Sequence, residues 1–445
     1  MEKTAKKDSF KSRTGFILAC IGSAVGMGNL WRFPMLVSTY GGLTFIIPYL
    51  IFVAFIGSTG IIEEFALGRA AGMGPVGAFG MCTNARTGKA LPGKVIGAVP
   101  VIGSMGLSIG YLVVFAWITK YFVMACTGEL YKLGTDMELI GGAFGTTASA
   151  MGANLWIVIA AVLTFLIMSL GIAGGVEKAN KVMMPVLFGL LVVLGVYIAF
   201  LPGAADGYKY IFTFNGSGLA DPKVWVYAFG QAFFSLSVAG NGSVIYGSYL
   251  SKEEDIPYSA RMVAIFDTLA ALLASLVIIP AMATSGATLE SGGPGLIFIY
   301  LVNVINAMPG GRLVSIVFFT AVLFAGLSSI INLFECFTAL LFEQFKLGRK
   351  LSTLISVGTG CIAAICIQAI TSEWMDVVSI YICPLGALLA GIMFFHVADK
   401  SFALDSVNLG AGKPVGKYFY PLGKYAYCSA AFLALVLGAL WGGIG

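Results

Sequence analysis

The sequence feature that most limits the fold is a run of small residues inside the first long apolar segment. Residues 22–29 read Gly-Ser-Ala-Val-Gly-Met-Gly-Asn and lie between the apolar stretches 16–21 and 30–37. Each glycine weakens a helix interior by about 1 kcal/mol relative to alanine. Backbone that leaves helical bonding at membrane depth is tolerated only where protein or a water-filled cavity surrounds it. The run therefore predicts a discontinuous helix whose free backbone groups bind something small.

The hydrophobic content of the chain indicates an all-α polytopic membrane protein. Of its 445 residues, 58% are hydrophobic and 11% are charged, whereas soluble domains carry about 25% charged residues. We expect eleven spans, each holding the ~20 residues that cross the hydrocarbon core. The expected spans are residues 14–37, 41–68, 93–126, 154–172, 178–201, 223–250, 259–285, 311–342, 351–371, 374–396 and 418–441.

The positions of Lys and Arg predict the orientation in the membrane. Most of the 26 basic residues fall on the side that carries the N-terminus, and basic loops stay in the cytoplasm. We expect a cytoplasmic segment 1–13, a C-terminus outside the cell, and a place in the inner (plasma) membrane of a prokaryote. The net charge of +5 follows from this bias. We therefore expect a small molecule and the lipid bilayer as partners, with neither nucleic acid nor an obligate protein partner.

A second interruption lies in the sixth expected span. Residues 233–242 read Phe-Phe-Ser-Leu-Ser-Val-Ala-Gly-Asn-Gly. Interrupted helices at matching positions of two halves indicate a repeat with a binding site at its centre. Spans one and six are five apart, and a unit of five spans inverts its second copy across the membrane. We expect a first repeat over 14–205, an inverted second repeat over 206–400, and a cytoplasmic loop with the eleventh helix over 401–445.

Several motifs, in the same order along the chain, resemble the neurotransmitter:sodium symporter family. They are GSAVGMGNLWRFP at 22–34, Glu64 with LGR at 67–69, QAFFSLS at 231–237 and AGLSS at 325–329. The resemblance implies the LeuT-type fold, a 5+5 inverted repeat with broken helices one and six plus the eleventh helix of bacterial members. It also implies sodium-coupled uptake of an amino acid or amine by alternating access, with no enzymatic chemistry.

The resemblance implies two sodium ions, which as hard cations take oxygen ligands. The first ion would be held by Ala24, Asn29, Ser235 and Asp267. The second ion would be held by Gly22, Val25, Ala325, Ser328 and Ser329. Asp267 lies in an apolar span, where acids are functional by default. Its carboxylate would supply the charge that relatives with asparagine take from chloride, so we expect no chloride requirement. An alternative is that the two serines bond back to the preceding helical turn.

The resemblance also implies a substrate site between the two breaks. Its residues would be Ala24, Met27, Gly28, Leu107, Tyr111, Phe234, Ser235, Ser237, Val238, Gly240, Ser329 and Leu333. The N–H groups of Met27 and Gly28 would meet the substrate carboxylate at a positive helix end, with the Tyr111 hydroxyl beside them. Gly240 stands where leucine-transporting members carry phenylalanine, and Asn241 offers a bond to a polar tip. We therefore expect a neutral, large or aromatic amino acid.

Two gates complete what the resemblance implies. The outer gate would consist of Arg32, Asp376, Gln231 and Phe234. The inner gate would consist of Lys7, Phe10, Tyr249 and Glu343. Lysine lacks the planar bidentate geometry of arginine, so we expect a looser inner gate. Glu64 would support the unwound backbone of span six, with pairing to Arg69 as the alternative.

Other function classes are less consistent with the sequence. Residues 106–110 match the GxSxG pattern, which is meaningful only at a strand-to-helix turn with acid and histidine partners, and the one histidine is His396. A channel needs a continuous polar path rather than two broken helices with gates. A proton-coupled amino-acid transporter of the same fold, and a sodium-coupled transporter of another small amine, remain alternatives.

Overall fold

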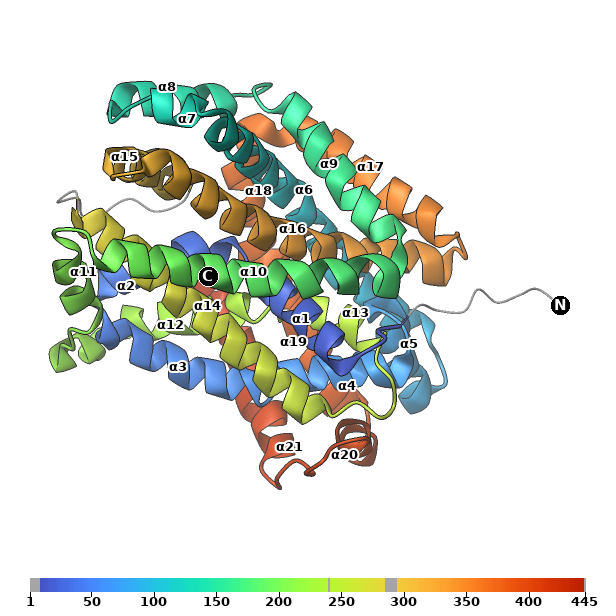
Figure 1. Ribbon diagram of the computed structural model, residues 1–445. Helices are drawn as coiled ribbons and strands as arrows, with labels where there is room; N and C mark the ends of the chain where they lie inside the picture. Colours follow the sequence, from blue (N-terminus) through green and yellow to red (C-terminus); the bar gives the residue numbers. More distant parts are fainter. Residues whose placement is uncertain (1–8, 239–240, 285–293, 444–445) are drawn as a thin grey trace.

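The computed structural model describes residues 9–238, 241–284 and 294–443, and all regular secondary structure in that part is helical (Figure 1). The helices run across the view of Figure 1, with α5 at one end and α7, α8, α11 and α15 at the other. The first half of the chain forms α1 Arg13–Ala24, η1 Gly28–Arg32, α2 Phe33–Tyr40, α3 Leu43–Gly57, α4 Gly60–Ala71, α5 Pro75–Thr87, α6 Leu91–Thr127, α7 Glu129–Lys132, α8 Met137–Thr147, α9 Asn154–Ser169, η2 Ile172–Val176 and α10 Glu177–Ala199.

The second half of the chain begins with short outer helices and then repeats the pattern of long, interrupted segments. It forms α11 Ala204–Ile211, η3 Gly216–Ala220, α12 Pro222–Ser235, α13 Gly242–Gly247, α14 Ile256–Thr284, η4 Leu296–Tyr300, α15 Leu301–Ala307, α16 Gly311–Gln344, α17 Arg349–Ile367, η5 Gln368–Ile370, α18 Thr371–Val377, η6 Val378–Ile382, α19 Cys383–Ile392, η7 Met393–Val397, α20 Lys400–Asn408, α21 Phe419–Pro421, η8 Leu422–Tyr427 and α22 Cys428–Trp441.

Every expected span has a helical counterpart, although not always a straight one. In the described part of the chain, seven helical stretches are long and apolar enough to cross a membrane, and α1 with η1–α2 forms an eighth that bends by 56°. The remaining spans are short or joined: α9 has 16 residues, α12 and α13 together form the broken sixth span, and spans nine and ten run on as one stretch over Arg349–Val397. The division into two repeats stays a prediction.

The two predicted breaks are confirmed, and their local chemistry is visible. The first helix ends at Ala24, and Val25 takes an extended conformation. The Asn29 side chain then accepts a hydrogen bond from the Gly26 N–H at 3.0 Å, which satisfies backbone released by the break. In the sixth span, Ser237 and Asn241 have φ values of 55° and 58°. Left-handed backbone is uncommon for residues other than glycine, so this break is held by its surroundings.

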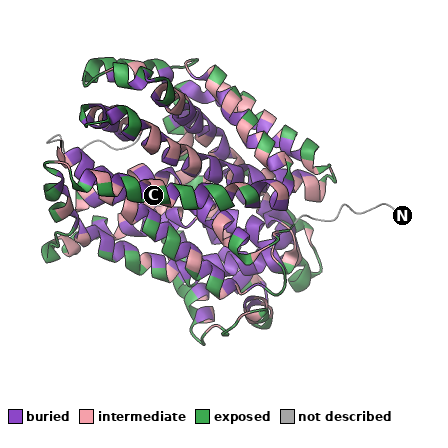
Figure 2. Cartoon of the chain, viewed as in Figure 1, coloured by how far each residue is buried: buried purple, intermediate pink, exposed green. Residues whose placement is uncertain are grey.

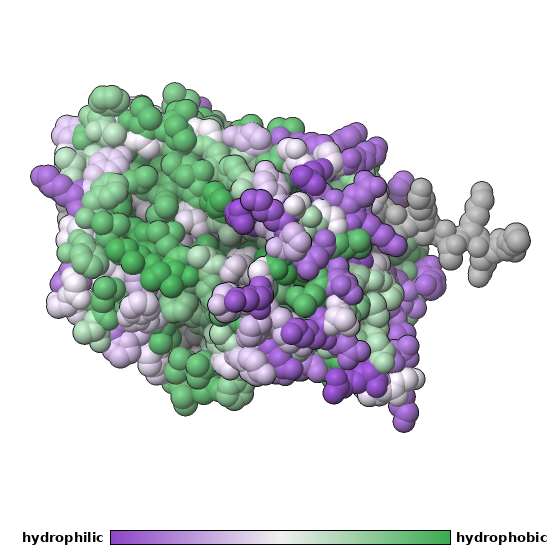
Figure 3. All heavy atoms as spheres, turned by 90° about the horizontal axis from the view of Figure 1, so that it is seen from below, coloured by the Kyte–Doolittle hydropathy of each residue, from purple (hydrophilic) through white to green (hydrophobic). Residues whose placement is uncertain are grey.

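Burial follows the arrangement expected of a bundle in a membrane. Buried residues concentrate where the helices face one another, and exposed residues lie on the outward faces (Figure 2). Seen from below, hydrophobic residues cover much of the surface, and hydrophilic residues gather toward the end at which α5 lies (Figure 3). The breaks of α1–η1 and α12–α13 lie inside this bundle, so whatever they bind is surrounded by protein.

Candidate ion- and substrate-binding site

A cavity of about 420 Å³ lies between the two broken helices. Most of the predicted substrate residues line it, namely Ala24, Met27, Gly28, Leu107, Tyr111, Phe234, Ser235, Ser237, Ser329 and Leu333. Val238 is the exception: its side chain is fully buried and is not part of the lining. Val238 follows Ser237, whose backbone is left-handed with φ 55°. Gly240 lies outside the described residues.

A buried hydrogen-bonded cluster brings together the side chains predicted for the first sodium ion. Asn29 Nδ2 donates to Asp267 Oδ1 at 2.8 Å and to Ser235 Oγ at 3.0 Å. Ser235 Oγ in turn donates to Asp267 Oδ2 at 2.6 Å. Tyr49, from α3, adds a longer contact to Ser235 Oγ at 3.5 Å. Burying an ionised carboxylate is expensive unless a charge partner compensates it, and no cation pairs with Asp267 among the described residues. The cluster therefore suits a small cation.

The residues predicted for the second ion also meet, at the contact between α1 and α16. Ser329 Oγ donates to the carbonyl oxygens of Gly22 and Val25 at 3.3 and 3.2 Å. Ser328 Oγ donates to the Ala325 carbonyl at 3.1 Å, which is the bond to the preceding turn named above as the alternative. Ser328 thus follows the local pattern, whereas Ser329 reaches across to the broken helix. The carbonyl oxygens of Gly22 and Val25 therefore both face the Ser329 hydroxyl, and these three oxygens can together bind a cation.

The outer half-helix presents its N-terminus to the cavity. It begins at Gly28, so the N–H groups at its first turn lack partners within the helix. Tyr111, from α6, is half-buried beside the break, and its hydroxyl oxygen is buried next to Ser329 and the Met27 backbone. A Cβ atom at Gly26 would lie 3.2 Å from that hydroxyl. A helix N-terminus and a hydroxyl donor together form a site for an anionic group.

The outer gate residues lie around the cavity without closing it. Arg32, Asp376, Gln231 and Phe234 all belong to the lining. Within the described residues no ion pair joins Arg32 to Asp376, and Arg32 Nε is buried without a hydrogen bond. Gln231 Nε2 donates to the Gly28 carbonyl at 3.2 Å. The gate is therefore open in this structure.

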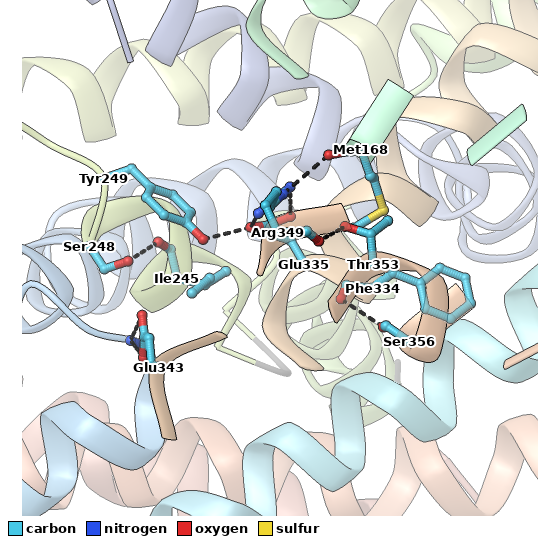
Figure 4. Close-up of polar contacts among 11 residues, drawn as sticks. Met168, Ile245, Ser248, Tyr249, Phe334, Glu335, Glu343, Arg349, Thr353 and Ser356 are labelled. Carbon is cyan, nitrogen blue, oxygen red and sulfur yellow. Dashed lines mark hydrogen bonds and ion pairs between the residues drawn. The ribbon is translucent and has the colours of Figure 1, made fainter. Parts of the chain in front are cut away.

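A buried ion pair that was not predicted from the sequence joins α16 and α17. Glu335, fully buried on α16, accepts hydrogen bonds from both terminal nitrogens of Arg349, with Nη2 at 2.7 Å. Tyr249 points at the same carboxylate and donates to it at 2.6 Å (Figure 4). The signal available in the sequence was an acid at position 335 inside an apolar span.

The predicted inner gate is only partly described. Glu343 accepts from the Gly74 N–H at 2.9 Å, and Lys7 lies outside the described residues. Phe10 packs on Phe16 and Tyr249, with ring centroids 5.3 and 6.4 Å apart. Tyr249, which was predicted to support the inner gate, donates its hydroxyl to Glu335. Phe10 and Tyr249 therefore form an aromatic pair that contacts the Glu335–Arg349 ion pair through the Tyr249 hydroxyl.

Glu64 contacts the broken sixth span through Asn241. Its side chain is fully buried, and Oε1 accepts from Asn241 Nδ2 at 3.2 Å. The alternative pairing of Glu64 with Arg69 is wrong, because Arg69 donates to backbone carbonyls, among them that of Glu254 at 2.6 Å. Asn241, expected at the substrate tip, is fully buried and is not part of the cavity lining, and its amide nitrogen is the atom that donates to Glu64. Asn332, on α16, lines the cavity instead.

The fold and the cavity define a class of protein. A helical bundle whose two discontinuous helices meet at a cavity with oxygen ligands and a helix N-terminus has the architecture of a secondary transporter. Residues 106–110 lie inside α6 rather than at a strand-to-helix turn, so the nucleophile pattern is fortuitous.

Comparison with known proteins gives the family. The family model described as the Sodium:neurotransmitter symporter family matches residues 7–135 and 143–407. The chain belongs to this family of sodium-dependent, multi-pass membrane transporters, and it is not an enzyme.

Relatives and a solved structure agree with this assignment. An uncharacterized sodium-dependent transporter of Methanocaldococcus jannaschii is 31% identical over 91% of this chain and 84% of that protein. The sodium-dependent neutral amino acid transporter B(0)AT3 of Mus musculus is 24% identical over 93% of this chain and 81% of that protein. The crystal structure of MhsT in complex with L-phenylalanine superposes with a TM-score of 0.85, at 32% identity, over 97% of this chain and 99% of MhsT. The LeuT-type fold is thereby confirmed.

Proposed function

We propose that the protein is a sodium-coupled symporter that imports a neutral amino acid, large or aromatic, by alternating access. The observation that carries the proposal is the buried Asp267 carboxylate, joined to Asn29 and Ser235 at the edge of the cavity. A carboxylate in this position selects for a cation. The Tyr111 hydroxyl and the first turn of η1 select for the carboxylate of the cargo.

Two sodium ions are cargo in this proposal. The first binds at Ala24, Asn29, Ser235 and Asp267, and the second at Gly22, Val25, Ala325, Ser328 and Ser329. An elementary charge that crosses 100 mV yields about 2.3 kcal/mol, to which the sodium gradient adds. Because Asp267 supplies a negative charge beside the first ion, chloride is not required.

The amino acid occupies the cavity between the breaks. Its carboxylate lies at Met27, Gly28 and Tyr111, and its ammonium group lies near the backbone carbonyls of the two broken helices. Its side chain points toward Leu107, Ser237, Ser329 and Leu333, which line one part of the cavity. MhsT forms its complex with L-phenylalanine, and this supports an aromatic or similarly large side chain for the cargo of the present protein.

Alternating access follows from the state of the two gates. Among the described residues Arg32 and Asp376 form no ion pair, whereas Glu335 and Arg349 do, and this difference supports an outward-facing state. Closure of Arg32 over the cargo and release of the inner pair would then expose the site to the cytoplasm. In this scheme the N-terminus is cytoplasmic, the C-terminus is outside, and the two repeats move relative to each other.

The proposal is tested by uptake of labelled L-phenylalanine into proteoliposomes that contain the purified protein. We expect accumulation above equilibrium only with an inward sodium gradient, and none when choline replaces sodium at fixed pH. Uptake in choline that follows an imposed pH gradient would instead indicate proton coupling. Flux that never exceeds equilibrium would indicate a channel. Competition by each of the twenty amino acids against the label then identifies the cargo.

A further inference from the structure

Two glycines in the inner half of the first span leave notches in its surface, and side chains of the fifth span fill them. Gly15 and Gly22, seven residues apart, lie on one face of α1, and each receives a polar side chain of α10. A Cβ atom at Gly15 would lie 2.2 Å from Glu177 Oε1. A Cβ atom at Gly22 would lie 2.1 Å from Asn180 Oδ1. The two glycines therefore let a carboxylate and an amide of α10 approach the backbone of α1.

The first of these contacts is fully satisfied. Glu177 accepts hydrogen bonds from the Lys11 N–H at 2.7 Å and from Ser12 Oγ at 2.8 Å. Lys181 Nζ pairs with the same carboxylate at 2.6 Å. Glu177 thus holds the N-terminal end of α1, and this role accounts for the notch at Gly15.

The second contact is not satisfied. Asn180 is fully buried, and its Nδ2 donates to the Val176 carbonyl at 2.9 Å. Its Oδ1 has no hydrogen-bond donor in the described part of the chain. Exchanging the amide oxygen and nitrogen would turn Oδ1 toward the Val176 carbonyl, where two acceptors would face each other. This orientation is therefore the favoured one, and it points an amide oxygen at α1 where no described residue donates to it.

The free oxygen lies beside the second candidate sodium site. Gly22, which it touches, carries one of the carbonyls that Ser329 Oγ contacts. The same notch adjoins α16, because a Cβ atom at Gly22 would also lie 2.9 Å from Ser328 Cβ. The ligands proposed above come from α1 and its break and from α16 only. Asn180 approaches the same place from α10.

We propose that Asn180 is a further oxygen ligand of the second sodium ion, a proposal that rests on the function proposed above. The ion would then connect three helices, α1, α16 and α10. Its departure would remove one connection between α1 and α10, while the hydrogen bonds of Glu177 to Lys11 and Ser12 would remain. Sodium at this site thus holds span one against span five until the inner side opens.

The test is a sodium titration of the thermal stability of the purified protein without substrate, which does not depend on transport. We expect Asn180→Ala to weaken the apparent sodium affinity about tenfold, the typical lower bound when a supporting metal contact is lost. Asn180→Asp keeps an oxygen and adds a negative charge, so its sodium affinity should equal or exceed that of the parent. Ser329→Ala is the matched control from the other side of the site.

The outcomes separate the two proposals. If Asn180→Ala binds sodium like the parent while Ser329→Ala binds it weakly, Asn180 is a packing residue and the present inference is overturned. If Ser329→Ala also binds sodium like the parent, the second sodium site itself is overturned. If Asn180→Ala does not fold, Asn180→Asp decides alone, because weaker sodium binding by that variant contradicts a ligand role.

Discussion

Asn29 and Asp267, 238 positions apart in the chain, share a hydrogen bond of 2.8 Å between Nδ2 and Oδ1. Asn29 also accepts from the Gly26 N–H through its other amide atom. The Asn29 side chain therefore satisfies a backbone N–H at the break in span one and also holds the carboxylate of Asp267 in span seven. A cation bound at Asp267 would be coupled directly to the conformation of the broken helix, and through it to the cargo. By linkage, ion and cargo should raise each other's affinity by the same factor.

The first prediction concerns the charge of Asp267. Asp267→Asn keeps the size of the side chain and removes the buried negative charge. We expect the sodium concentration for half-maximal uptake to rise about tenfold or more. Replacing chloride by gluconate should leave uptake by the parent protein unchanged. Asp206→Asn, at an acid whose side chain is 78% exposed, should behave like the parent. A parent protein that stops transporting in gluconate would contradict the charge argument.

The second prediction concerns the inner pair. Glu335→Gln leaves Arg349 without its counter-charge, and breaking a buried pair costs about 3–5 kcal/mol. Tyr249 joins Glu335 to Phe10 and so to the inner half of span one. We expect a lower unfolding temperature and faster hydrogen–deuterium exchange over residues 13–24. Lys209→Met removes the exposed pair with Asp206 and should change neither. Unaltered exchange over 13–24 in Glu335→Gln would show that this pair does not hold span one.

The sequence predicted the breaks because their causes are local. Glycines and Asn29 in an apolar segment weaken the helix at that point whatever the helix packs against. Residues 22–29 alone were therefore sufficient to predict the break in span one. The grouping of Asn29, Ser235 and Asp267 needed the family resemblance, since no local pattern relates three separate spans. The order of motifs supplied that relation, and the structure places the three side chains in one cluster.

Other contacts could not be predicted, because they depend on how helices are rotated against one another. Glu335 and Arg349 lie on either side of the turn between α16 and α17, and only the packed structure shows that they meet. Asn241 was assigned to the cargo, yet it has a left-handed backbone and its amide nitrogen donates to Glu64. A single residue with a left-handed backbone changes the direction of its side chain, and the spacing of residues in the sequence does not show this change.

The third prediction concerns the support of the sixth span. Glu64→Ala removes the acceptor of the Asn241 amide, and leaving a buried donor unsatisfied costs about 1–3 kcal/mol. We expect a lower unfolding temperature and weaker binding of the amino acid, because the unwound segment loses its anchor. Glu64→Gln retains a carbonyl oxygen that accepts the same bond and should stay closer to the parent. Equal losses in both variants would show that the charge of Glu64, rather than the hydrogen bond, is needed.

The last prediction concerns the space at Gly26. A Cβ atom there would lie 2.8 Å from Ser329 Oγ and 3.2 Å from the Tyr111 hydroxyl. Ser329 is held by its bonds to Gly22 and Val25 and has little freedom to retreat. We expect Gly26→Ala to abolish sodium-dependent binding of labelled L-phenylalanine while the protein still purifies as a folded species.

The matched control for Gly26→Ala is Gly141→Ala in α8, where a Cβ atom meets nothing within 4 Å. Alanine is favoured over glycine by about 1 kcal/mol in a helix interior, so this variant should be as stable as the parent or slightly more stable, with unchanged binding. Full binding by Gly26→Ala would mean that cargo and ion do not occupy the space between Tyr111 and Ser329. The position of the site between the two broken helices would then be wrong, even though the breaks themselves are present.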